Sequence, residues 1–141
     1  MDYKKMYMLS KDAKLIRQEV FVDEQHFENE FDTIDDLDTT AHLVFYQNNQ
    51  PIAVCRYFPG DTPNTYILGR LAVRKKARGQ HLGKDILQVI EESIRKDGGK
   101  LICLSAQERV KDFYKKSGYQ ASGNIYYDEY CPHIHMEKHL S

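Results

Sequence analysis

The sequence predicts a single α/β domain in which helices flank a mixed β-sheet, and three observations carry this prediction. Apolar segments 41–47 and 51–57 flank Asn48-Asn49, a pattern typical of an antiparallel hairpin. A strand, a helix and a second strand follow over residues 64–105, an order that requires a right-handed crossover. Two further strands close the chain. At 141 residues, the chain is long enough for one sizeable core and too short for two.

Three segments carry the signals of helices. Residues 12–22 place apolar side chains at helical spacing. Residues 83–96 do the same, and this helix is expected to end at Gly98-Gly99 after two basic residues. A third helix is expected over residues 108–117, with Gly118 at its end.

The remaining apolar segments are expected to be strands. Residues 64–73 form the strand before the central helix, and residues 100–105 form a strand with no polar face, which is typical of the middle of a sheet. Segments 119–127 and 133–138 are the two final strands.

Composition narrows the class of protein. The chain is 41% hydrophobic and 29% charged, and no run approaches the roughly 18 apolar residues of a membrane span. Residues 1–14 are too polar for a secretory signal, so a cytoplasmic location and no membrane partner are expected. The three cysteines are widely spaced and odd in number, which predicts reduced thiols.

Charge is unevenly distributed along the chain. No Lys or Arg occurs between Arg17 and Arg56, while acidic residues crowd into the same stretch. Two interpretations stay open for this segment: a place where a cationic amine binds, or a solvated loop. The acidic residues are Asp23, Glu24, Glu28, Glu30, Asp32, Asp35, Asp36 and Asp38.

A cationic turn between a strand and a helix, at residues 68–83, is the most informative segment. A helix start offers unpaired amides and a partial positive charge, which together bind anions. Gly79 and Gly83 allow close approach of the backbone to a phosphate. The spacing fits neither a Walker loop nor a Rossmann loop. Full charges around the turn come from Arg74, Lys75, Lys76, Arg78 and Lys84.

The turn Arg78-Gly79-Gln80-His81-Leu82-Gly83 resembles motif A of the GNAT superfamily of N-acetyltransferases, R/Q-x-x-G-x-G/A. His81 stands where that family usually has glycine. The resemblance implies a GNAT fold, whose central sheet is mixed, mostly antiparallel, flanked by helices and splayed at the acetyl-CoA site. It also implies a set of donor-binding residues: Leu71, Ala72, Val73, Arg78, Gly79, Gln80, His81, Leu82 and Gly83.

Three further segments narrow the resemblance. Residues 17–25 are similar to the R-x-x-V-F-V-x-E-Q opening of ElaA-like GNAT proteins, and residues 132–136 are similar to their P-H-I-G-M ending. Residues 113–119 resemble the F-Y-x3-G-F/Y element of the superfamily. These matches span nearly the whole chain and imply one N-acetyltransferase domain over 1–141. The implied donor is acetyl-CoA, and the implied acceptor is a primary amine of a small molecule or peptide, which attacks directly through a tetrahedral intermediate.

The same resemblance implies catalytic roles. A protonated amine must lose a proton before it attacks a thioester, so a general base is useful. Glu24 is the first candidate, with Glu19, His42 and His133 as alternatives, and the two histidines are also expected to bind substrate. Tyr114 of the F-Y element is expected to protonate the leaving thiolate. A backbone amide of the splayed strand is expected to stabilise the oxyanion.

The end of the chain raises the question of a metal site. Cys131, His133 and His135 alternate and would share one face of a strand, an arrangement that can bind zinc. Pro132 interrupts the start of that strand, and no pair of cysteines lies nearby. We therefore expect no metal at these three residues and none in the reaction.

Other functions stay open. The chain could be a non-catalytic acyl-CoA sensor or regulatory protein with the same fold. Nucleic-acid binding is not expected, because the cationic stretch is short and lacks interleaved aromatic residues. The tyrosine-rich stretch with Tyr126, Tyr127 and Tyr130 is compatible with a homodimer interface or with the lining of a pocket.

Overall fold

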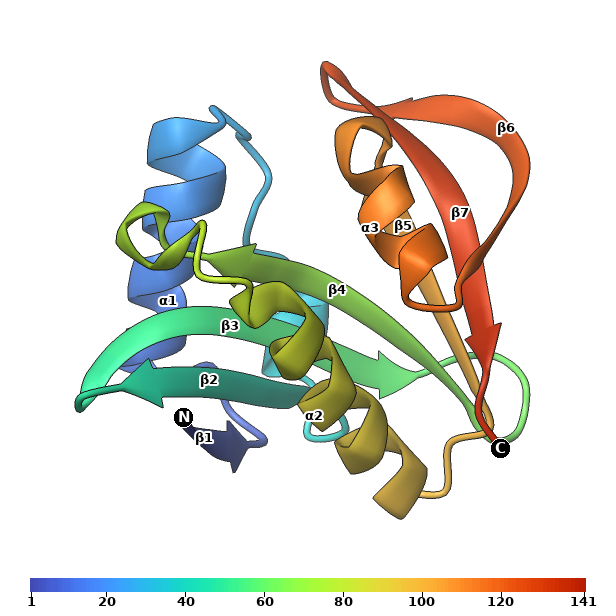
Figure 1. The fold of residues 1–141 in the computed structure, drawn as a ribbon, viewed down its shortest axis with the longest axis horizontal. Helices are drawn as coiled ribbons and strands as arrows, with labels where there is room; N and C mark the ends of the chain where they lie inside the picture. The colour runs from blue at the N-terminus through green and yellow to red at the C-terminus, as the bar shows by residue number, and fades with distance from the viewer.

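The computed structural model describes all 141 residues. It contains one seven-stranded sheet with the order β1-β2-β3-β4-β5-β7-β6, in which only β4 and β5 are parallel (Figure 1). The strands are β1 (Asp2–Met6), β2 (Ala41–Gln47), β3 (Gln50–Pro59), β4 (Thr65–Val73), β5 (Leu101–Gln107), β6 (Gln120–Asp128) and β7 (Cys131–His139). The helices are α1 (Lys11–Arg17), α2 (Leu82–Lys96) and α3 (Lys111–Lys116), with short turns η1 (Gln18–Glu24), η2 (Thr33–Asp36), η3 (Lys75–Ala77) and η4 (Glu108–Val110).

The mixed, mostly antiparallel sheet confirms the expected fold class. The hairpin of β2 and β3 turns at Asn48 and Asn49, whose φ values of 53° and 63° suit a tight type I′ turn. Strand β1 is an element that the sequence did not indicate. It pairs antiparallel with β2 at the edge of the sheet, and its mostly exposed, lysine-containing sequence shows no apolar alternation.

The first helix differs from the uninterrupted helix expected over residues 12–22. It is α-helical only as far as Arg17 and then widens into the π-helical turn η1. The amide of Gln25 donates to the carbonyl of Val20 over 3.1 Å, a hydrogen bond that spans five residues. π-Helical turns occur often at functional sites. This one carries Phe21 into the candidate site described below.

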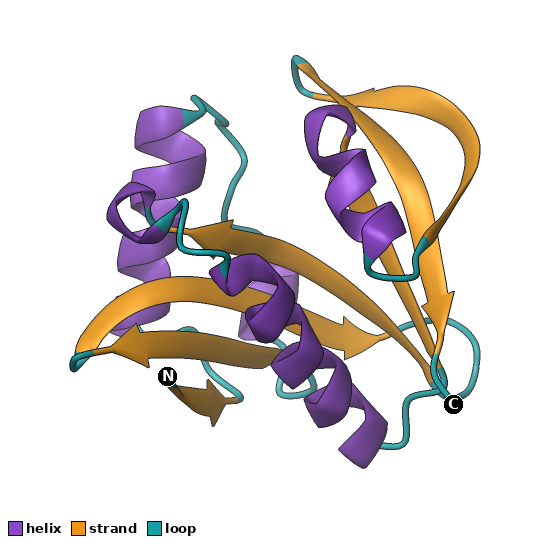
Figure 2. Ribbon diagram, in the orientation of Figure 1, coloured by secondary structure: helices purple, strands orange, loops and turns teal.

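Helices cover both faces of the sheet (Figure 2). Alternating residues of β2 show the two sides: Leu43 and Phe45 pack in the core beneath α2, while Val44 packs with Ile16 of α1 in a second, smaller core. No helix combines the length and the apolar character that crossing a bilayer requires.

The acidic segment is folded against three arginines, which pair with three of its carboxylates. Arg17 is fully buried and donates Nη1 to Asp35 Oδ1 over 2.6 Å. Arg56 Nη1 donates to the same Asp35 oxygen over 2.9 Å. The complete ionic network consists of Arg17, Arg56, Arg70, Glu30, Asp32 and Asp35. Each of these carboxylates is therefore paired with arginine, and those of Glu30 and Asp35 are also buried.

Asp35 is the anion at the centre of this network. Burial alone would raise the pKa of Asp35, but the hydrogen bond and the charge of Arg17 outweigh burial and lower it to about 2. The reference value is 3.8. Because the folded pKa lies below the reference value, the ion pairs stabilise the fold above about pH 4, and this contribution is lost as the pH falls towards 2.

We expect Asp35→Asn to lower the free energy of unfolding by about 3–5 kcal/mol at pH 7, since it leaves two buried guanidinium groups without their shared anion. The difference from wild type should shrink as the pH falls below about 4. Urea unfolding over a pH series measures both effects. Asp36→Asn is the control, because Asp36 is exposed and its side chain makes no hydrogen bond or ion pair. An equal loss in both variants would contradict the central role of Asp35.

Candidate active site

The sheet opens between β4 and β5. These strands pair only from Thr65 to Leu68 and from Leu101 to Leu104. Beyond this point they diverge (Figure 1), while β5 stays paired with β7 as far as Gln107. On the side facing β5, residues 69–73 of β4 therefore have no strand partner. Their backbone groups on that side are available to a ligand.

A β-bulge on β4 lies at the opening. Arg56 pairs with Gly69 and Val54 with Ala72, so two residues of β4 stand opposite the single residue Cys55. Arg70 is one of the two and has a φ of 54°, an uncommon conformation for a residue with a side chain. Such a bulge leaves one residue outside the backbone ladder and redirects its neighbours.

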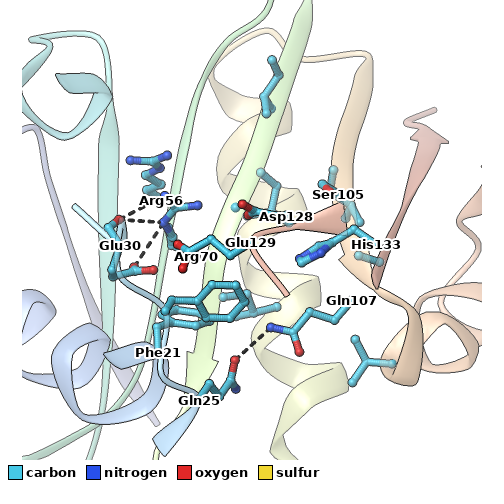
Figure 3. A pocket seen from close by; sticks show the side chains of 18 of the residues that line it. Phe21, Gln25, Glu30, Arg56, Arg70, Ser105, Gln107, Asp128, Glu129 and His133 are labelled. Carbon is cyan, nitrogen blue, oxygen red and sulfur yellow. Dashed lines mark hydrogen bonds and ion pairs between the residues drawn. The ribbon is translucent and has the colours of Figure 1, made fainter. Parts of the chain in front are cut away.

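A cavity of about 270 Å³, the first cavity, fills this opening (Figure 3). Its floor is apolar and aromatic, and polar side chains approach from both halves of the split sheet. Figure 3 shows Glu30, Arg56 and Arg70 on one side and Ser105, Asp128 and His133 on the other. The apolar lining residues are Phe21, Phe27, Phe58, Ile67, Leu68, Leu71, Leu104, Ala106, Val110 and Tyr114.

A second cavity of about 430 Å³ adjoins the first and is lined by Leu71, Ala72 and Val73 of β4 and by Arg78 of the cationic turn. Gln25, Leu71 and Arg109 line both cavities. The two cavities thus meet at the opening, one beside the cationic turn and the other beside the ionic network.

Two sets of hydrogen bonds bridge the opening. Gln107 Nε2 donates to Gln25 Oε1 over 2.9 Å (Figure 3), which joins β5 to the segment after η1. The carboxylate of Glu129, in the turn between β6 and β7, accepts from the amides of Glu28 and Asn29 over 2.8 and 3.0 Å. These contacts hold the N-terminal segment against the C-terminal half and close one side of the first cavity.

His133 of β7 presents a free nitrogen to the first cavity. Its Nδ1 lies 3.0 Å from the carbonyl oxygen of Cys131, and because a carbonyl can only accept, Nδ1 must carry the proton. In the neutral ring, Nε2 is therefore an unprotonated acceptor, and it has no partner in the protein. The ring is 6% exposed and stacks on Tyr126 at 6.1 Å between centroids.

Tyr114 of α3 lines the same cavity from the other side of the sheet. Its ring packs edge-on against Phe113 and Tyr119, and its hydroxyl makes no hydrogen bond to the protein. Burial raises the pKa of Tyr114 well above its ordinary value, so the hydroxyl stays protonated throughout the neutral range.

Glu24 and Glu19 are both held by arginines of the cationic turn. Glu24 accepts two hydrogen bonds from Arg78, at 2.6 and 2.9 Å. Hydrogen bonding to Arg78 lowers the pKa of Glu24. Glu19 is bound in the same way by Arg74, whose hydrogen bond lowers the pKa of Glu19. A carboxylate with a lowered pKa is a weaker base. Arg74 and Arg78 are each held in place by a carboxylate at the edge of the cationic turn.

His42 lies outside both cavities. It is 1% exposed on β2, and its Nε2 donates to the backbone carbonyl of Asp35 over 3.2 Å. Burial lowers the pKa of His42, and Nδ1 is buried without a partner. His42 therefore lies against Asp35 of the ionic network and lines neither of the two cavities.

The cationic turn leads directly into α2. Gly79 has a φ of 80° and His81, at the start of the helix, a φ of 58°; no side chain caps this helix. The left-handed conformation of His81 explains why glycine suits this position. At Gly83, an added Cβ would lie 3.2 Å from the ring of Phe113, so this glycine serves helix packing and not only phosphate access. Lys75, Lys76 and Lys84 form no ion pair.

Several lining residues carried no sequence prediction. Arg70, Gln107 and the adjacent pair Asp128 and Glu129 come from three separate segments, and only the opening of the sheet gathers them. Gln25 stands in the N-terminal motif of residues 17–25, which was the one sequence signal that pointed to a lining residue of this group.

The tyrosine-rich stretch is divided between packing and exposure. Tyr130 stacks on Phe27 at 5.4 Å between centroids, and Tyr127 is 70% exposed, so a homodimer interface at this stretch stays a prediction.

Comparison with known proteins identifies the family. Residues 9–140 match the family model of the acetyltransferase (GNAT) domain. The uncharacterized N-acetyltransferase YjcF of Bacillus subtilis is 34% identical over 130 residues, covering 91% of either chain. A crystal structure of a candidate N-acetyltransferase from Lactobacillus plantarum superimposes with a TM-score of 0.86 at 28% identity over 100% of both chains.

The crystal structure of Escherichia coli ElaA superimposes with a TM-score of 0.84 at 23% identity, covering 97% of this chain and 98% of ElaA. This likeness shows a common fold. The protein therefore belongs to the GNAT family of acetyltransferases, is an acyltransferase, and shares the fold of ElaA.

Proposed function

We propose that this protein transfers the acetyl group of acetyl-CoA to a primary amine of a small molecule or peptide. The observation that carries the proposal is the opening between β4 and β5, where the second cavity, beside the cationic turn and its uncapped helix start, meets the first cavity, lined by Tyr114 and His133. A CoA thioester and an amine can approach one another there from opposite sides.

The cationic turn and β4 are the proposed donor site. The amides from Gly79 to Gly83 face no capping side chain, so they can bind a pyrophosphate, while nearby lysines add charge. The unpaired edge of Leu71, Ala72 and Val73 can hydrogen-bond the amides of the pantetheine arm as a neighbouring strand would. This proposal places the thioester where the two cavities meet.

The amine then attacks the thioester carbonyl carbon, and a tetrahedral intermediate with a negatively charged oxygen forms. The β-bulge at Arg70 and Leu71 supplies the backbone amide that we assign to this oxyanion, because bulged residues leave the β3–β4 ladder. When the intermediate collapses, the carbon–sulfur bond breaks and the amide product and the CoA thiolate remain.

Tyr114 is assigned as the acid that protonates this thiolate. Tyr114 lines the first cavity, its hydroxyl makes no hydrogen bond to the protein, and its raised pKa keeps the proton in place until the thiolate forms.

His133 is assigned as the base that accepts the proton of the amine. Its Nε2 is free and lies on the cavity, whereas Glu24 is neutralised by Arg78. A lysine-like amine has a pKa near ~10.4, so only on the order of one molecule in a thousand is unprotonated at pH 7. In this proposal, Glu24 instead orients Arg78 at the donor site.

Calorimetric titration with acetyl-CoA is the experiment that tests the function, followed by an amine screen with detection of the released thiol. Saturable one-to-one binding and thiol release that depends on the amine are expected. Binding without turnover for any amine would instead support a sensor, and absence of binding at millimolar acetyl-CoA would remove the donor site.

His81→Gly should bind acetyl-CoA within about twofold of wild type, because glycine adopts the left-handed conformation freely, and His81→Val should bind it several-fold more weakly.

Tyr114→Phe should lower kcat by about 100-fold and leave the Kd for acetyl-CoA nearly unchanged, because only the proton donor is lost. The hydroxyl has no partner in the protein, so its removal orphans no buried group. The free energy of unfolding should therefore stay within about 0.5 kcal/mol of wild type. Turnover equal to that of wild type would show that another group protonates the thiolate.

His133→Ala should lower kcat/KM by about 100-fold, and added imidazole should restore part of the activity, as expected when a base is missing. Glu24→Gln is the matched comparison and should mainly weaken acetyl-CoA binding, since it releases Arg78. If Glu24→Gln abolishes turnover while His133→Ala retains it, the base is Glu24 as the sequence first indicated.

A further inference from the structure

Three side chains that have no part in the proposed acyl transfer lie close together on the solvent-accessible side of β5 and β7. Cys103 of β5 and His135 and Glu137 of β7 place one potential ligand atom each within 4.8 Å of the others. Cys103 Sγ lies 3.8 Å from Glu137 Oε2, and His135 Nε2 lies 3.3 Å from the same oxygen. A thiol, an imidazole and a carboxylate together are a donor set that zinc prefers.

The sheet itself fixes this arrangement. Cys103 pairs directly with Glu137 across β5 and β7, and Ser105 pairs with His135. Side chains at alternate positions of a strand share a face, so His135 and Glu137 point to the same side as Cys103. The three side chains therefore extend from two hydrogen-bonded neighbouring strands and not from a flexible loop.

The distances match a tetrahedral site. With metal–ligand bonds of about 2.3 Å to sulfur and about 2.0–2.2 Å to nitrogen and oxygen, the ligand atoms of a tetrahedron lie about 3.6 Å apart for sulfur and oxygen and about 3.4 Å apart for nitrogen and oxygen. The corresponding distances here are 3.8 and 3.3 Å. The third pair of atoms, Cys103 Sγ and His135 Nε2, lies within 4.8 Å.

The cluster is partly open to solvent. The side chains of His135 and Glu137 are 43% and 38% exposed, and Cys103 is half-buried. An ion can enter from the solvent, and a water molecule can take the fourth position. Cys131 and His133, the other residues weighed as ligands from the sequence, do not join the cluster; Cys131 Sγ lies against its neighbour's carbonyl, and His133 Nδ1 is bonded to the backbone.

We propose that Cys103, His135 and Glu137 form a binding site for a thiophilic divalent cation of the Zn²⁺ class. On binding, Cys103 loses its proton and coordinates as a thiolate, and His135 coordinates through Nε2 with its proton on Nδ1. The site is separate from the proposed acyl transfer and does not depend on it. It clamps β5 to β7 two residues from Ser105 and His133, which line the first cavity.

Titration of reduced, chelator-treated protein with Co²⁺ tests the site. We expect one equivalent to produce the thiolate-to-cobalt charge-transfer absorption and the visible bands of tetrahedral cobalt, and Zn²⁺ to displace it. Cys103→Ala, His135→Ala and Glu137→Gln should each weaken binding by at least about tenfold, the loss that removal of even an outer-shell partner causes. His139→Gln, an exposed histidine on the same strand, is the control.

Two results would overturn the proposal: absence of the charge-transfer absorption in wild type, or cobalt binding that the three ligand variants leave unchanged. Circular dichroism of each variant establishes that it is folded, and Glu137→Gln preserves the shape of the side chain. Binding of acetyl-CoA is measured in parallel, so loss of the metal site and loss of the donor site are read separately.

Discussion

The separation of β4 from β5 is the constraint on which the rest of this structure depends. Four residue pairs hold the two strands parallel, and beyond Leu68 and Leu104 the sheet divides into two halves. A divided sheet leaves backbone groups without partners, which is costly unless a ligand or other groups satisfy them. The bulge at Arg70, the two adjoining cavities and the position of Tyr114 all follow from this division.

Polar contacts hold the two halves at the opening, in addition to the apolar core that both halves share. On one side, the network centred on Arg17 and Asp35 fixes the segment after η1 against β3 and β4. Across the opening, Gln25 and Glu129 join this segment to the C-terminal half. Charged and hydrogen-bonded groups impose direction, so they can set the width of a cavity that dispersion forces alone would tend to close. The ion pairs of the acidic stretch thus help to hold the walls of the first cavity in position.

The sequence predicted most of the fold, because apolar periodicity and glycines report local structure directly. The hairpin at Asn48, the helix before Gly98 and the apolar strand β5 lie where the patterns placed them. Strand β1 and the π-helical turn η1 escaped prediction for physical reasons. An exposed edge strand has no apolar alternation, and one extra residue in a helical turn leaves no signature in composition.

The sequence by itself determined the family, the order of the elements and the cationic turn at Gly79, since these depend on neighbours along the chain. Only the tertiary structure decided which charges are free. Glu24 is bound by Arg78, 54 residues away, a contact that no local pattern indicates. His133 gained its open nitrogen from a bond to its own strand, and Cys103 met His135 only through the pairing of β5 with β7. Pairing between distant segments brings such side chains together, and no local pattern encodes it.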